Sequence, residues 1–235
     1  MKEEIYTIPV MDAFNQDGCP FCAMRRKLEK DSIDFMLGPS YMEDDIRMET
    51  DRKGFCRRHL VMMYEQQNRL GLALMVGTRL KRVIKNMSVL PKETSAKRKG
   101  FFKKAEEAGS SAYGTVLGSC YICDRIGGTF DRYVSTFFYM WPKEKELRAA
   151  FEKSPICVPH FAMLRESGKK YLNGTHEGEF QAKLSETEDK ILAKLDADLD
   201  LFIRKFDYRY KDEPEGDSRD ALPRAINALS GEDGA

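Results

Sequence analysis

The residues most able to do chemistry in this sequence form four short motifs, each a pair of residues separated by two others. Along the chain they are Cys19 with Cys22, Cys56 with His59, Cys120 with Cys123, and Cys157 with His160. They use all six cysteines and two of the three histidines. Each residue of the second two motifs lies 101 positions after its counterpart in the first two. This shared offset indicates an internal duplication.

Three thiolates and one imidazole form a donor set typical of zinc. A Cys-x2-Cys motif can direct two sulfurs at one ion about 2.3 Å away, and a second motif completes a tetrahedron. Soft sulfur ligands disfavour magnesium and calcium. Four protein ligands leave no coordination position for a substrate. The sequence therefore predicts two zinc ions with a structural role and no catalytic residue at either.

The spacing within each half favours closure of each site inside that half. The chain has 33 residues between Cys22 and Cys56 and again between Cys123 and Cys157. We therefore expect two ligand sets, one of Cys19, Cys22, Cys56 and His59, and one of Cys120, Cys123, Cys157 and His160. The alternative is an exchange, in which each motif of the first half pairs with one of the second. In that case Cys19 would lie nearer to His160 than to His59.

Three other interpretations of the motifs remain open. Cysteines can be small buried hydrophobic residues, with the histidines as satisfied polar groups. Four Cys and His ligands can also hold an iron-sulfur cluster. A third interpretation makes Cys19 and Cys22 a thioredoxin-like redox pair, but that motif belongs to a βαβ unit and the surrounding pattern is helical.

The segments around the motifs have the apolar spacing of amphipathic helices. We predict helices over about 22–37, 56–87, 120–141, 157–172, 179–210 and 221–229. His176 is expected in an exposed loop. The predicted fold is all-α, with internally duplicated helical hairpins, each clasped at its start by a Cys3His metal site, and a long C-terminal helix.

The predicted organisation has four segments. They are a first metal-binding repeat at 1–90, a basic connector at 91–114, a second metal-binding repeat at 115–175, and a C-terminal helix and tail at 176–235. Basic residues beside Phe101 and Phe102 make the stretch 92–104 a candidate nucleic-acid contact. A solvated linker is the plainer interpretation.

Charge and hydropathy restrict the partners and the compartment. The 39 basic and 38 acidic residues give a net charge of +1, so no overall field attracts nucleic acid or an anionic membrane. The N-terminus lacks the apolar stretch of a secretory signal, and no later run reaches the ~20 apolar residues that span a bilayer. We expect a cytoplasmic protein without membrane contact, in which six cysteines serve as ligands or reactive thiols rather than disulfides.

The motifs, together with the stretch from Phe206 to Gly216 and the run from Asp220 to Ile226, resemble an uncharacterised family from anaerobic Gram-positive bacteria. The resemblance covers nearly the whole chain. Some members carry the label of an ABC-transporter substrate-binding protein, which the missing export signal and the absence of alternating strands and helices do not support here. The resemblance implies a complete, cytosolic bacterial protein, and it supplies no activity.

No catalytic constellation is apparent. A Ser-His-Asp set cannot be assembled if His59 and His160 are ligands, and the glycine-rich phosphate-binding motifs are absent. We therefore expect a zinc-stabilised helical scaffold or interaction protein with a protein partner rather than an enzyme. An iron-sulfur or thiol-based redox or metal-sensing protein is the first alternative. A nucleic-acid binder acting through residues 92–104 is the second.

Overall fold

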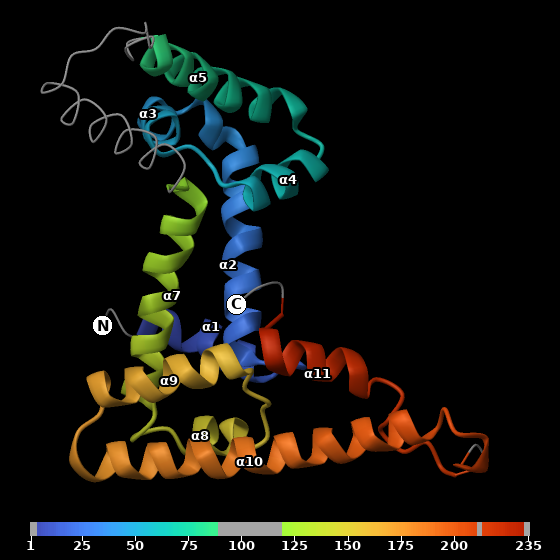
Figure 1. Cartoon of the computed structure of the whole chain (residues 1–235). Coiled ribbons are helices and arrows are strands. Elements are labelled where there is room, and N and C mark those ends of the chain that lie inside the picture. The colour runs from blue at the N-terminus through green and yellow to red at the C-terminus, as the bar shows by residue number, and fades with distance from the viewer. Residues whose placement is uncertain (1–3, 89–118, 211–212, 233–235) are drawn as a thin grey trace, which may run out of the picture. The chain divides into compact units, whose positions relative to one another are not determined.

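The computed structural model describes residues 4–88, 119–210 and 213–232, and the regular elements in these ranges are all helices, joined by turns and loops, with no strand among them. The predicted all-α class is confirmed for this part of the chain. Figure 1 shows the helices and two short 3-10 turns, η1 and η2: α1 (Glu4–Phe14), α2 (Pro20–Leu37), η1 (Pro39–Met42), α3 (Asp44–Lys53), α4 (Arg57–Glu65), α5 (Arg69–Ser88), α7 (Tyr121–Met140), α8 (Lys145–Phe151), α9 (Val158–Tyr171), α10 (Gly174–Arg204), η2 (Tyr208–Tyr210) and α11 (Ala221–Ser230).

Three pairs of helices begin at positions that share the offset of the motifs. The starts of α2 and α7, of α3 and α8, and of α4 and α9 are each 101 residues apart. The four motifs lie at the starts of α2, α4, α7 and α9. In all four, the carbonyl of the first cysteine accepts the first helical hydrogen bond, so this cysteine is the N-cap residue. The fourth motif residue then lies in the first helical turn, where its side chain can meet that of the first.

The predicted single helix over 56–87 is wrong, because the chain breaks between α4 and α5. The side chain of Asn68 explains the break. Its Oδ1 accepts a hydrogen bond of 2.9 Å from the backbone N–H of Gly71, which is the geometry of a helix N-cap. Its Nδ2 donates to the carbonyl of Leu37 at 2.6 Å and so anchors the new helix start to the end of α2.

Other helices differ from the prediction mainly at their ends. The long C-terminal helix α10 starts at Gly174, so His176 lies in its first turn rather than in a loop, although its side chain is exposed as expected. Helix α11 confirms the short helix predicted near the C-terminus. The sequence analysis missed α1, α3 and α8. Helix α3 is mostly charged and has no continuous apolar stripe to reveal it.

The chain forms two compact units, Met1–Lys27 with Thr129–Ala235, and Leu28–Gly128. We call them the terminal unit and the central unit. Their boundaries fall inside α2 and α7, after Lys27 and after Gly128, which are again 101 positions apart. The units therefore do not follow the predicted segments 1–90 and 115–175. The predicted connector 91–114 lies outside the described residues.

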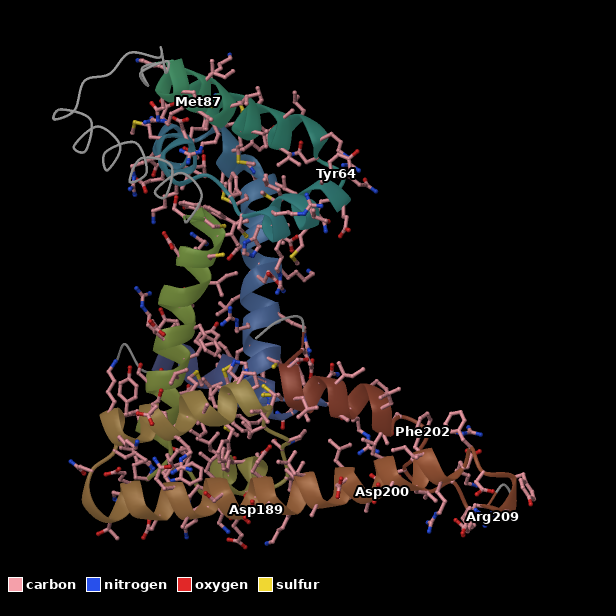
Figure 2. All side chains as sticks on the ribbon, in the orientation of Figure 1. Tyr64, Met87, Asp189, Asp200, Phe202 and Arg209 are labelled. Carbon is pink, nitrogen blue, oxygen red and sulfur yellow. The ribbon has the colours of Figure 1, made fainter. Side chains whose placement is uncertain are left out.

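The terminal unit has an aromatic core. Helices α9 and α11 pack along α10 (Figure 1), and α1 packs against α8. Phe137 on α7 is fully buried and contacts the rings of six residues: Phe14, Phe21, Phe138, Trp141, Phe151 and Phe180. These rings bury a large apolar area and meet mainly in tilted or edge-to-face arrangements, which stabilise aromatic pairs. The C-terminal half of α10 carries exposed acidic residues such as Asp189 and Asp200 (Figure 2).

The central unit has a smaller, aliphatic and methionine-rich core. Its buried residues include Met36, Met63 and Met75, and α5 packs on α3 and η1. The opposite side of α5 leaves several apolar side chains exposed, from Leu70 to Met87, and Tyr64 on α4 is exposed as well (Figure 2). No helix within the described ranges combines the length and the apolar composition needed to cross a lipid bilayer.

Candidate metal centres

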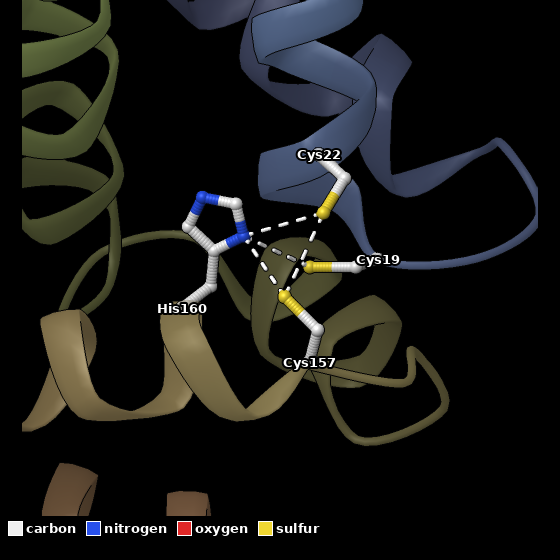
Figure 3. A group of neighbouring side chains, drawn as sticks. All are labelled: Cys19, Cys22, Cys157 and His160. Atoms are coloured by element: carbon white, nitrogen blue, oxygen red, sulfur yellow. Dashed lines mark hydrogen bonds between the residues drawn. The ribbon is translucent and has the colours of Figure 1, made fainter. Parts of the chain in front are cut away.

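All eight motif residues come together in two groups of four. The first group, which we call the Cys19 site, contains Cys19, Cys22, Cys157 and His160 and lies in the terminal unit (Figure 3). The second, the Cys56 site, contains Cys56, His59, Cys120 and Cys123 and lies in the central unit. Within each group, all ligand atoms lie within 4.8 Å of one another.

The predicted pairing within each half is therefore wrong, and each site combines one motif from each half. The division into two compact units matches the exchange. Helix α2 crosses the unit boundary, so Cys19 and Cys22 at its start belong to the terminal unit, whereas Cys56 and His59 belong to the central unit. The start of α9 meets Cys19 and Cys22 instead.

The geometry of the Cys19 site matches a tetrahedron of donors. Nδ1 of His160 faces all three sulfurs, at 3.1 Å from Cys157, 3.4 Å from Cys22 and 3.6 Å from Cys19. The sulfurs of Cys22 and Cys157 are 3.6 Å apart. A tetrahedral zinc ion with bonds of about 2.3 Å to sulfur and about 2.0 Å to nitrogen would hold its ligands about 3.5 Å (N to S) and about 3.8 Å (S to S) apart.

The Cys56 site has the same geometry. Nδ1 of His59 lies 3.2 Å from Cys56, 3.3 Å from Cys120 and 3.4 Å from Cys123. The sulfurs of Cys56 and Cys123 are 3.9 Å apart, far beyond the disulfide bond length of about 2.05 Å, and all six cysteines are free thiols. Both donor sets therefore fit one tetrahedral ion.

The two histidines are held in different ways. Nε2 of His59 donates to Oε1 of Glu29 at 2.9 Å, and Arg58 donates to the other carboxylate oxygen at 2.8 Å. A carboxylate on the far nitrogen fixes the tautomer and ring orientation of a metal-binding histidine, and it leaves the Nδ1 lone pair for the ion. Glu29 is buried, so this contact is shielded from water.

At the Cys19 site an aromatic ring takes the place of that carboxylate. The residue 101 positions after Glu29 is Phe130, whose ring centroid lies 5.7 Å from that of His160. Phe21 flanks the same imidazole at 5.9 Å. The described residues place no hydrogen-bond acceptor at Nε2 of His160. Packing, rather than a charged hydrogen bond, orients this histidine.

The close packing of the donors shifts their proton equilibria. Hydrogen bonding with Cys157, together with burial, raises the pKa of the Cys19 thiol to about 11. Burial and the neighbouring Cys120 raise the pKa of Cys123 to about 12. Burial and the nearby Arg25 lower the pKa of His160 to about 4, so this imidazole is neutral at pH 7. A bound divalent cation would reverse the thiol shifts, because its charge favours the thiolate.

Further contacts enclose the two sites unequally. Glu232, just after α11, accepts a hydrogen bond from the backbone N–H of Cys19, pairs with Arg26, and donates its own N–H to the sulfur of Cys22 at 3.4 Å. All four donors of the Cys19 site are buried.

At the Cys56 site, the N–H of Tyr121 donates to the carbonyl of Gly54 at 3.0 Å, but Cys56 is only half-buried and Cys123 is exposed. Pro20 occupies the position matching Tyr121 and has no N–H to make such a bond.

A family model described as a family of unknown function (DUF6062) matches residues 1–235. The chain belongs to the DUF6062 family. No match was found among the curated proteins or among the solved structures. DUF6062 membership thus defines the relatives of the chain and assigns no activity to its two sites.

The sequence indicated all eight residues that the structure brings together in the two groups, but not the residues that contact them. Glu29 lies in a stretch of α2 so rich in charged residues that it resembles a solvated helix face. Glu232 lies more than 200 positions from the cysteines it contacts. The place of Phe130 beside His160 could have been predicted, because Phe130 lies 101 positions after Glu29, which contacts His59. Once a support residue is known in one half, the offset of 101 locates its counterpart.

Proposed function

We propose that this DUF6062 protein is a zinc-stabilised helical scaffold, in which each compact unit is held together by one Cys3His-bound ion. The observation that carries the proposal is the pair of four-donor groups, whose ligand atoms have the separations of a tetrahedron around one ion. The internal duplication and a reducing compartment, in which the thiols stay unoxidised, are parts of the same proposal.

The compact spacing supports a single ion over an iron-sulfur cluster at each site. A cluster inserts several iron and sulfide atoms between its protein ligands, so those ligands stand farther apart than around one ion. Here the measured N to S and S to S separations run from 3.1 to 3.9 Å. Three thiolates with one imidazole favour zinc among the common divalent ions, because sulfur disfavours magnesium and calcium.

A structural role follows from where the donors lie. Each site joins the starts of two helices that are distant in the sequence, α2 with α9 and α7 with α4. A tetrad of this kind exists only in the folded chain, so the free energy of metal binding adds to the free energy of unfolding, on the order of 10 kcal/mol for structural zinc at neutral pH.

The experiment is metal analysis followed by thermal unfolding. Protein purified without oxygen should contain two zinc ions per chain and no sulfide or visible chromophore. A strong chelator should then lower the melting temperature followed by circular dichroism. Iron with sulfide would establish the redox alternative instead. An unchanged melting temperature after confirmed metal removal would exclude the structural role.

We propose that the scaffold binds another protein. The exposed apolar side of α5 supports this proposal. Its exposed side carries Leu70, Leu80, Ile84 and Met87, each more than half exposed. A contiguous apolar helix face of this kind is typical of protein interaction sites. The nucleic-acid alternative depends on residues 92–104, which lie outside the described part of the chain.

A further inference from the structure

The eight donors differ in their exposure to solvent, and the two that solvent reaches, Cys56 and Cys123, both belong to the Cys56 site. In the Cys19 site, Cys22 and Cys157 are 1% and 3% exposed, and Glu232 contacts Cys19 and Cys22. In the Cys56 site, Cys120 and His59 are equally buried, but Cys123 is exposed and Cys56 is half-buried. Reaction of a thiolate with a dissolved reagent requires access as well as ionisation.

We propose that Cys123 is an oxidation site for hydroperoxides, and that its oxidation to a disulfide with Cys56 releases the ion of the Cys56 site. This rests on the proposed function, because a metal-bound thiolate is the reactive form. The two sites, although built from the same donor types, then differ in behaviour: the Cys19 site retains its ion in the presence of oxidant, and the Cys56 site releases its ion.

The positions of Cys56 and Cys123 suit the second half of this reaction. Their sulfurs are 3.9 Å apart. Cys56 is the N-cap residue before α4, with extended backbone angles, and Cys123 lies in the first turn of α7. A non-helical residue at one end of the pair allows the small backbone adjustment that brings two sulfurs to a bond length of about 2.05 Å.

Proximity alone does not distinguish the sites, since Cys22 and Cys157 are slightly closer, at 3.6 Å. Access is what differs. The Cys19 site therefore serves as an internal control with the same donor types, a similar sulfur separation and no exposed thiol.

The chemistry balances with the hydroperoxide as oxidant. The Cys123 thiolate attacks the terminal peroxide oxygen, the O–O bond breaks, and Cys123 becomes a sulfenic acid; the departing hydroxide (or alkoxide) takes up a proton and leaves as water (or an alcohol). The Cys56 thiolate then attacks the Cys123 sulfur and displaces its hydroxide. With hydrogen peroxide the sum is two thiolates, one peroxide and two protons giving one disulfide and two waters. Cys120 and His59 alone then remain as donors, too few to retain the ion.

The test uses the full chain loaded with two zinc ions under anaerobic conditions. Hydrogen peroxide is added in excess, released zinc is followed with a coloured chelator, and the cysteine products are mapped by peptide mass spectrometry. We expect one zinc ion to leave at least about tenfold faster than the other, because buried structural cysteines are inert. The early product should contain the Cys56 to Cys123 disulfide, and a sulfenic-acid trapping reagent should label Cys123.

Two matched variants make the result specific. Cys123→His replaces the reactive thiolate by another zinc donor, so it should retain two ions and lose the fast release. Cys22→His makes the same change in the Cys19 site and should retain the fast release. If Cys123→His does not fold, trapping on the unchanged protein decides the point. Equal release from both sites, or an early disulfide that involves Cys19, Cys22, Cys120 or Cys157, would overturn the inference while leaving the zinc scaffold intact. A chain that binds no metal would overturn both.

Discussion

The Cys19 site and the Cys56 site are built from the same donors at matching positions, yet almost every neighbour differs. Glu29 on His59 becomes Phe130 on His160, and Arg58 becomes Pro159. Glu232 encloses one site, whereas Cys123 leaves the other open. The four donors thus keep one geometry in both sites, while the imidazole is oriented by a charged hydrogen bond in one site and by aromatic packing in the other.

The largest expected effect comes from removing one thiolate from either site. Cys157→Ser should expose the amides of residues 129–210 to hydrogen exchange, and Cys56→Ser should expose those of residues 28–88. The reason is that each unit would lose much of the binding free energy of its ion, on the order of 10 kcal/mol for structural zinc. Hydrogen exchange read by mass spectrometry measures both units at once. His176→Ala, on an exposed part of α10, should change neither.

Combining these variants tests which donors share an ion. Adding Cys19→Ser to Cys157→Ser should cost little more, because one substitution already disrupts the site. Adding Cys19→Ser to Cys56→Ser should give the sum of the two effects, since independent sites are additive. The opposite result would restore the pairing within each half that the sequence favoured.

That pairing could not be read from the sequence, although the donors could. The identical spacing of 33 residues in both halves looks like evidence for closure within a half. An exchange between two equal halves preserves the same spacing, so the spacing does not distinguish the two arrangements. What decides is the division into two units inside α2 and α7, and the continuous sequences of these two helices give no sign of it.

The helices at the motifs were predictable because each combines local signals. Pro20 and Pro159 lie within the first two positions of α2 and α9, where proline is favoured, and Gly38 with Pro39 ends α2. Long-range contacts had no such signal. The bond from His59 to Glu29 joins residues 30 positions apart in different helices, and Asn68 breaks a run of apolar residues that has helical spacing.

A smaller effect, confined to one site, is expected from Glu29→Gln. A neutral amide holds the imidazole of His59 less strongly, so zinc affinity at the Cys56 site should fall about 10- to 100-fold while the Cys19 site is unchanged. Competition with a chelator of known affinity should resolve one weakened and one unaltered ion. Glu49→Gln, at an exposed glutamate that pairs with Arg52, is the matched control in the same unit. Equal weakening of both ions would mean that Glu29 acts on the fold rather than on His59.

The smallest effect concerns Glu188, a carboxyl group of the terminal unit that belongs to neither metal site. Glu188 on α10 is buried, and neither of its carboxylate oxygens has a hydrogen-bond partner among the described residues. Burial raises its pKa to about 7, and the nearby backbone of Ile156 opposes the shift only in part. In the unfolded chain its pKa returns to the usual value near 4.5. The folded state therefore favours the neutral acid.

The sign of the pH dependence follows from that difference. A raised pKa in the folded state gives a stability that is fully present below pH 4.5 and is lost as the pH rises through 7. Glu188→Gln removes the ionisable group, so it should be more stable than the parent at pH 8, by on the order of 2 kcal/mol after allowance for solvent screening. The advantage should shrink towards pH 5.

Loss of zinc at low pH affects both proteins alike, so denaturant unfolding of the two at each pH isolates Glu188. Glu186→Gln changes an exposed glutamate bound to Lys190 and should show no such gain. A parent and a Glu188→Gln variant that keep the same difference from pH 5 to pH 8 would mean that Glu188 titrates alike in the folded and unfolded chains.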